Sequence, residues 1–201
     1  MRLYLSSERL GERSGTLLGM VAGPRVAIIA NGYDYCGAIA RDFYRAEVYD
    51  PVPEFEALGL EPEELDLRAH FGDPQSLRQR LASYDLVWVM GGNSFVLRRA
   101  MRSSGFDHVI RDLLEADAIT YGGYAAGAVV AGPSLRGMEL MDDPWESPGR
   151  LRRTPDLARL GAHPLRYRSA LPFAPSRRGG SREDRFLHGS AESPASHPLG
   201  R

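Results

Sequence analysis

Short apolar runs bounded by Gly, Asp or Pro alternate along the chain with segments whose apolar residues recur every three or four positions. Runs of the first kind are typical of strands, and segments of the second kind are typical of amphipathic helices. The predicted strands are residues 3–5, 26–30, 65–67, 86–90 and 118–121. The run 86–90 has no polar alternation, so we expect a central strand that is covered on both faces.

Three helices can be placed by their first residues. Asp73 precedes Pro74, and an Asp cap followed by proline is a favourable way to begin a helix. Asn93 and Asp107 are expected to cap two further helices, because their side chains can accept free N–H groups. Strands that alternate with helices of this length predict a three-layer α/β domain with a mostly parallel sheet.

The composition changes near Pro144, after which Pro, Ser, Gly and Arg dominate and no long apolar period continues. We therefore assign residues 1–145 to the α/β domain. Residues 146–201 are expected to be an atypical segment of the same domain, either eroded or partly disordered, that adds little to the core.

Composition excludes several functional classes. All 25 basic residues are Arg, which excludes lysine Schiff-base chemistry. A net charge of -1 provides no field that would attract nucleic acid or an anionic membrane, so neither is expected as a partner. Cys36 is the only cysteine, so an intrachain disulfide is impossible. The cysteine content also excludes zinc-finger spacing, so no metal is expected, and a reducing cytoplasm is the expected location.

Two glycine-rich turns carry the candidate chemistry. Gly91, Gly92 and Asn93 follow the predicted central strand, and a Tyr-Gly-Gly-Tyr-Ala-Ala-Gly sequence centred on Ala125 follows the last one. In an open α/β sheet, ligands bind outside the carboxyl ends of the strands. The N–H groups of Gly92 and Ala126 could then converge as an oxyanion hole. The alternative is that the glycine pairs only form tight turns.

Four motifs in order resemble the peptidase E family, serine peptidase family S51. They are Leu3-Tyr4-Leu5-Ser6-Ser7, the 91–95 turn, the sequence around Ala125, and the stretch from Pro133-Ser134-Leu135-Arg136-Gly137 to Asp142-Asp143-Pro144. The resemblance covers roughly the first 145 residues. It implies a flavodoxin-like fold, similar to that of class I glutamine amidotransferases. It also implies a cofactor-free hydrolase of Asp-Xaa dipeptides with a Ser-His-carboxylate triad.

The resemblance places the nucleophilic serine at Ala125, whose methyl group cannot attack a carbonyl. Its histidine falls on Arg166, which stays protonated near neutral pH, and His163 is the nearest histidine that could replace it. Asp142, with Asp143 beside it, is the candidate carboxylate.

Three further residues each have a functional and a less specific explanation. Arg136 matches an arginine of the family and could hold an acidic side chain, although surface arginines without such a role are common. Ser94 is a poor replacement nucleophile because it lies on the neighbouring turn and would need a different attack geometry. Cys36 has no basic residue adjoining it in the sequence and is better explained by packing.

Two hypotheses remain. The chain is either a peptidase E-like hydrolase that is impaired or inactive, or a binding or regulatory protein that captures a small acidic peptide. A homo-oligomer is compatible with both. A nucleotide-binding module is disfavoured because the Gly-x-Gly-x-x-Gly spacing and a Walker lysine are missing.

Overall fold

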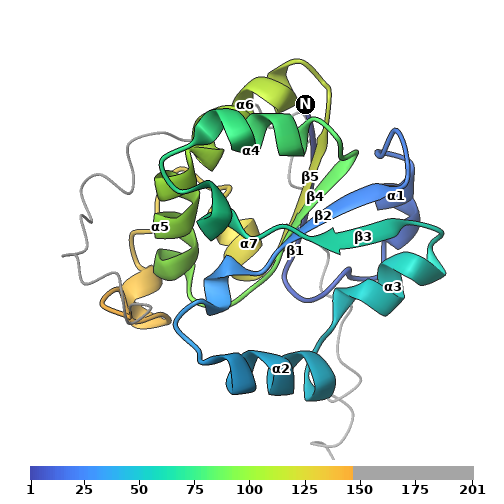
Figure 1. Ribbon diagram of the computed structural model, residues 1–201. Coiled ribbons are helices and arrows are strands. Elements are labelled where there is room, and N and C mark those ends of the chain that lie inside the picture. Colours follow the sequence, from blue (N-terminus) through green and yellow to red (C-terminus); the bar gives the residue numbers. More distant parts are fainter. Residues whose placement is uncertain (147–201) are drawn as a thin grey trace, which may run out of the picture. The chain divides into compact units, whose positions relative to one another are not determined.

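Five parallel strands form one sheet in the computed structural model, which describes residues 1–146 (Figure 1). The strands are β1 (Arg2–Ser6), β2 (Arg25–Ile29), β3 (Glu61–Glu64), β4 (Leu86–Val89) and β5 (Thr120–Tyr124). Their order is β1-β5-β4-β2-β3, and each of the four neighbouring pairs is parallel. β4 is therefore the middle strand, as its continuous apolar run predicts.

Helices cover both faces of this sheet. They are α1 (Ser14–Leu18), α2 (Ala38–Glu47), α3 (Pro51–Ala57), α4 (Pro74–Leu81), α5 (Ser94–Ser104), α6 (Phe106–Glu115) and α7 (Ala126–Val129). Three short 3-10 turns span Asn31–Tyr33, Leu67–His70 and Met138–Leu140.

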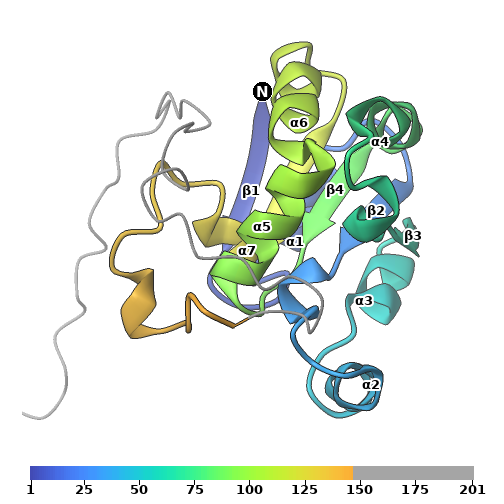
Figure 2. The ribbon, with the colours of Figure 1, turned by 60° about the vertical axis from the view of Figure 1, so that its left-hand side comes forward.

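The buried residues divide into two cores because side chains alternate along each strand. Val87 and Val89 of β4 pack with α4, α5 and α6, whereas Leu86 and Trp88 pack with α1 and α3. Figure 2 shows α5 and α6 lying across one face of the sheet. The three-layer α/β prediction is confirmed, with a sheet that is wholly parallel among the described residues.

The predicted strand at 65–67 is wrong. The edge strand is β3, whose Glu-Pro-Glu-Glu sequence has no apolar run and pairs only with β2. Leu65 and Leu67 are buried in the core beyond this strand, where Asp66 begins a 3-10 turn by accepting the N–H of Arg68. Burial therefore explains the apolar residues that suggested a strand.

The expected helix caps are right at two positions and wrong at one. The side chain of Asp73 accepts the N–H of Ser76, and that of Asn93 accepts two N–H groups of α5. Asp107 is not a cap, because α6 begins one residue earlier at Phe106, directly after the left-handed Gly105. The Asp107 carboxylate instead accepts a hydrogen bond from Arg98.

The strand order reverses at the centre of the sheet, between β2 and β4, because β3 lies outside β2 while β5 lies on the other side of β4. Apart from β1, the order is that of a flavodoxin-like sheet. Ligands of such sheets bind where the order reverses, outside the carboxyl ends of the strands. The turns that follow β2 and β4 are therefore the expected walls of a site.

The short helix α7 lies directly on the middle strand. A Cβ added to Gly127 would stand 2.1 Å from the Val89 carbonyl oxygen, and one added to Gly123 would stand 2.8 Å from Gly127. The buried hydroxyl of Tyr121 donates to the Gly127 carbonyl over 2.6 Å. Two glycines are thus required here because the strand and the helix meet through their backbones.

Gly127→Ala tests this contact. We expect a loss of about 1–3 kcal/mol in the free energy of unfolding, or more, because a methyl group has no space beside the Val89 carbonyl. Gly15→Ala in α1 is the matched control, since a Cβ there meets nothing within 4 Å. Urea denaturation of the two variants and the wild-type protein measures the difference. Equal stabilities for the two variants would contradict the close approach.

Candidate functional site

Two glycine turns cross at the point where the strand order reverses. A Cβ added to Gly32, in the turn after β2, would lie 2.2 Å from the Gly91 carbonyl oxygen. The N–H of Asn93 donates to the Gly32 carbonyl over 2.9 Å. The turn after β2 is therefore held against the turn after β4.

Ala125 forms a sharp turn between β5 and α7. Its dihedral angles are φ 47° and ψ -116°, a conformation that L-residues rarely adopt and that costs on the order of 1–3 kcal/mol. Its side chain is exposed, whereas Tyr124 and Ala126 on either side are buried. This is the backbone arrangement that lifts a nucleophile above an α/β sheet, and here it presents a methyl group.

The turns carrying Ala125 and Gly91 are neighbours, as the sequence predicts. A Cβ added to Gly91 would stand 3.4 Å from the Cβ of Ala125. The N–H of Ala125 also donates to the Ser6 carbonyl over 3.3 Å, which ties the turn to the end of β1.

The two N–H groups predicted to form an oxyanion hole are available. In the part of the chain that the structure describes, neither the Gly92 N–H nor the Ala126 N–H donates to another residue. Ala126 directly follows Ala125, and Gly92 directly follows Gly91, whose added Cβ would lie 3.4 Å from the Ala125 Cβ. The region thus offers donors without a nucleophile.

The segment 142–146 is fastened to the start of α5. Asp142 accepts the N–H of Ser94 over 2.8 Å, and the side-chain amide of Asn93 donates to the Asp143 carbonyl over 2.8 Å. Arg99 donates to the Pro144 carbonyl over 2.9 Å and to the Glu146 carbonyl. Burial lowers the pKa of Arg99. Asp142 therefore lies at the turn that follows β4, where its carboxylate caps α5.

The remaining candidates are placed as follows. Ser94 is fully buried at 0% exposure, so its hydroxyl is unreachable for a substrate. The guanidinium of Arg136 is exposed and has no hydrogen bond within residues 1–146. Cys36 is half-buried just before α2. His163 and Arg166 lie outside the described residues, as does the predicted C-terminal segment apart from Glu146.

A buried polar cluster beside the site was missed by the sequence reasoning. The Asn31 amide donates to Asp34 over 2.8 Å and to Asp66 over 2.9 Å, joining the ends of β2 and β3. Arg68 forms a bidentate pair with Asp66 and lies 3.5 Å from Asp34. The Asn-Gly-Tyr-Asp sequence after the strand at 26–30 was the available signal.

The pKa values of the two carboxylates in this cluster are shifted in opposite directions. Burial raises the pKa of Asp34, and the hydrogen bond from Asn31 offsets this only in part. Burial also acts on Asp66, but hydrogen bonds from Arg68 and Asn31 outweigh it and hold its pKa at about 2. Asp66 therefore keeps its negative charge to a lower pH than Asp34 does.

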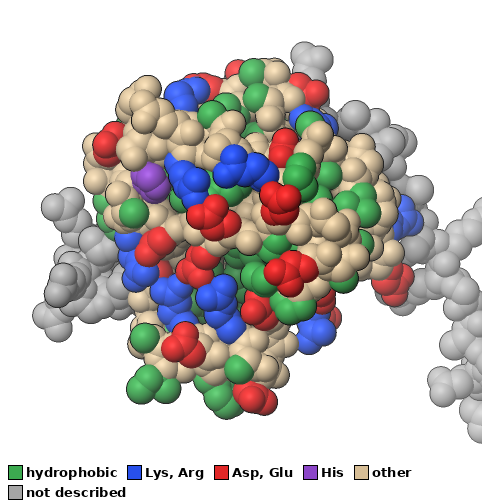
Figure 3. Space-filling view, turned by 45° about the vertical axis from the view of Figure 1, so that its right-hand side comes forward, with side chains coloured by type: hydrophobic (Ala, Val, Ile, Leu, Met, Phe, Trp, Pro, Cys, Tyr) green, Lys and Arg blue, Asp and Glu red, His purple; other side chains and the backbone are tan. Residues whose placement is uncertain are grey.

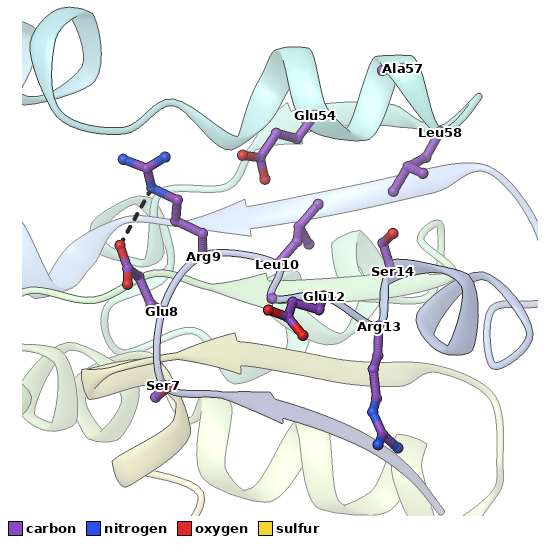
Figure 4. Close-up of a pocket in the computed structure, with 11 residues that line it drawn as sticks. Ser7, Glu8, Arg9, Leu10, Glu12, Arg13, Ser14, Glu54, Ala57 and Leu58 are labelled. Carbon is purple, nitrogen blue, oxygen red and sulfur yellow. Dashed lines mark ion pairs between the residues drawn. The ribbon is translucent and has the colours of Figure 1, made fainter. Parts of the chain in front are cut away.

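A hollow of about 810 Å³ lies away from these turns, between the loop after β1 and α3 (Figure 4). Glu8, Arg9, Glu12, Arg13 and Glu54 line it, and Arg9 pairs with Glu8 over 3.9 Å. Charges of both signs share this lining, so it favours no ligand of one charge. Figure 3 likewise shows basic and acidic side chains intermixed over one face.

No helix within residues 1–146 is both long and apolar enough to cross a membrane. No group of three or more His, Cys, Asp or Glu side chains in this region is arranged to hold a metal ion.

Comparison of the sequence with known proteins gives consistent results. The model of peptidase family S51 matches residues 37–184. An uncharacterized peptidase of Listeria monocytogenes is 34% identical over 88 residues, or 43% of this chain. An uncharacterized peptidase of Listeria innocua is 34% identical over 89 residues, or 44% of this chain. The chain spans 41% of the length of these two curated relatives.

The fold is also similar to a solved structure. The crystal structure of a peptidase E-like protein from Listeria monocytogenes matches with a TM-score of 0.59 and 24% sequence identity. The match covers 79% of this chain and 74% of that one. The predicted α/β fold is confirmed by this likeness.

Asp66→Asn tests the polar cluster through its dependence on pH. The folded-state pKa of about 2 lies below the usual value of about 3.9, so Asp66 stabilises the fold above pH 4. This stabilisation is lost as pH falls toward 2. Because the side chain is 37% exposed, screening should keep the effect below about 1 kcal/mol.

Urea denaturation between pH 2 and 6 measures the effect. We expect the free energy of unfolding of Asp66→Asn to fall less steeply with acid than that of the wild type. Asp42→Asn is the control, because Asp42 is exposed on α2 and has no ion pair within the described residues. Identical pH profiles for Asp66→Asn and the wild type would refute the role of Asp66.

Proposed function

The chain belongs to peptidase family S51, and from this premise we propose that it is a peptidase E-like protein for small acidic peptides. Its hydrolytic step is impaired or absent, because a methyl group occupies the nucleophile position. The expected ligands are Asp-Xaa dipeptides, which follow from the resemblance to peptidase E. The observation that carries the proposal is the conformation of Ala125, at φ 47° and ψ -116° with an exposed side chain.

The proposed chemistry lacks its nucleophile, has Arg166 at the position aligned with the histidine, and retains two candidate N–H donors. In a serine hydrolase the hydroxyl attacks the peptide carbonyl, and two N–H groups stabilise the oxyanion that forms. The N–H groups of Gly92 and Ala126 are the candidates for this second role. Removal of the nucleophile from such a triad costs about a millionfold in kcat. The residual rate is expected to be close to background.

The second candidate is a binding or regulatory protein that holds an acidic peptide without cleaving it. Neither the Gly92 N–H nor the Ala126 N–H has a partner within residues 1–146, while Ala125 presents an inert methyl group, and this combination favours the second candidate. Both candidates share the ligand and differ in turnover.

A paired measurement of binding and turnover separates the two. We expect the wild-type chain to bind Asp-Leu saturably in isothermal titration calorimetry and to release no leucine above background. An active serine homologue in the same assay is the positive control, and repeated purification excludes contaminating peptidases. Turnover near the homologue's rate would contradict the proposed loss of hydrolysis.

Restoring the nucleophile tests whether the site has lost one component or two. Ala125→Ser alone is expected to stay near background, because the position aligned with the histidine holds Arg166 and cannot take the serine proton. The double variant Ala125→Ser with Arg166→His should hydrolyse Asp-Leu faster than either single variant.

Release of leucine measures the rates of all three variants. Full activity of Ala125→Ser alone would show that the histidine alignment is wrong and that His163 is the base. Ala125→Ser with His163→Ala then serves as the control, since it should lose any activity that depends on His163.

A further inference from the structure

Three phenols meet beside the turn that carries Ala125. Tyr33 belongs to the turn after β2, Tyr44 lies on α2, and Tyr124 is the last residue of β5. The Tyr124 hydroxyl lies 3.4 Å from that of Tyr33 and 3.5 Å from that of Tyr44. The rings of Tyr33 and Tyr44 are 4.6 Å apart. We refer to these three residues as the tyrosine cluster.

Tyr33 is the member that lies next to the candidate site. The position of a Cβ on Gly91 would be 3.3 Å from the Tyr33 hydroxyl oxygen and 3.4 Å from the Ala125 Cβ. The hydroxyl and the methyl group therefore border the same small space. Ala125 is exposed and Tyr33 is half-buried, so a ligand placed against the methyl group can reach this hydroxyl.

Counting protons shows that the tyrosine cluster has a spare donor. Each hydroxyl has one proton to donate and can also accept. Either oxygen of each contact can be the donor, so when an acceptor approaches Tyr33, Tyr44 can donate to Tyr124 and Tyr124 can donate to Tyr33, which frees the Tyr33 proton. In this arrangement two of the three protons are used within the cluster and the third is left for an outside acceptor, and hydrogen bonds in line strengthen one another.

The cluster acts as a donor and not as a base. Burial raises the pKa of Tyr33, and burial likewise raises the pKa of Tyr124. These phenols therefore remain protonated at neutral pH. The nearby arginines already have carboxylate partners, since Arg41 and Arg45 both pair with Glu64 and Arg41 also lies 3.6 Å from Asp34. A carboxylate is the acceptor that gains most from a neutral donor in such a place.

We propose that the Tyr33 hydroxyl donates a hydrogen bond to a carboxylate oxygen of an acidic peptide bound against Ala125. Tyr124 accepts from Tyr44 and orients the free proton of Tyr33 toward the ligand. This inference rests on the proposed function and names the side chain that selects the acidic group. It also predicts that Tyr33 and Tyr44 contribute unequally to binding, because only Tyr33 contacts the ligand.

The experiment measures binding of Asp-Leu to the full chain by isothermal titration calorimetry. Tyr33→Phe should weaken binding by roughly 10- to 100-fold, since it removes a hydrogen bond to a charged group. Tyr44→Phe is the matched control and should weaken binding less than about threefold, because Tyr124 can still donate to Tyr33. Thermal unfolding checks that both variants keep the wild-type fold.

Altered ligands identify the carboxylate. If Tyr33 donates to the Asp side chain of the ligand, Asn-Leu should bind the wild type weakly, and its binding should be insensitive to Tyr33→Phe. If Tyr33 donates to the C-terminal carboxylate of the ligand, the C-terminal amide of Asp-Leu should instead bind weakly and be insensitive to Tyr33→Phe. Tyr33→His returns a neutral donor and should recover part of the affinity, which a packing defect would not allow.

Each unfavourable outcome points to a different error. Equal losses in Tyr33→Phe and Tyr44→Phe, or no loss in Tyr33→Phe, would overturn this inference and leave the proposed function standing. Tyr33 sensitivity that persists with both altered ligands would overturn the carboxylate assignment. A wild-type chain that binds no acidic dipeptide would overturn the proposed function and this inference together.

Discussion

The contact between the backbones of β4 and α7 is the constraint on which the site depends. Gly127 lies against the Val89 carbonyl, and the Tyr121 hydroxyl holds the Gly127 carbonyl from the side. A helix this close to its sheet leaves the chain no room for a gradual turn after β5. Ala125 must therefore adopt its strained conformation, and its side chain is directed out of the core.

The strained conformation of Ala125 is maintained although its side chain carries no nucleophilic atom. A positive φ in an L-residue is maintained only when the surrounding structure over-determines it. Here the Ser6 carbonyl accepts the N–H of Ala125, and the buried Tyr124 and Ala126 fix the chain on either side. The fold thus preserves the shape of the turn independently of the side chain that the turn presents.

Polar contacts hold distant segments of the chain around the site. Asn93 and Arg99 hold the chain from Asp142 to Glu146 on α5, and the Asn31 amide joins the ends of β2 and β3. α2 has no buried residue and is held by Tyr44 and by its arginines. Polar side chains therefore determine which loops surround Ala125, while the apolar cores determine only where the strands lie.

The sequence by itself determined the elements that local chemistry controls. The apolar run of β4 predicted a central strand, Asp73 and Asn93 predicted helix starts, and the small residues around Ala125 predicted a sharp turn. These predictions succeeded because each depends on a hydrogen bond or a packing requirement within a few residues.

Tertiary structure decided what depends on partners far away in the chain. β3 is a polar edge strand because it needs one neighbour only, so its sequence carries no strand pattern. Asp142 was a plausible triad carboxylate in the sequence, and only the fold places it on the N–H of Ser94. The tyrosine cluster joins residues that are up to 91 positions apart, and no local pattern encodes their meeting. Packing of the sheet and α2 brings them together beside Ala125.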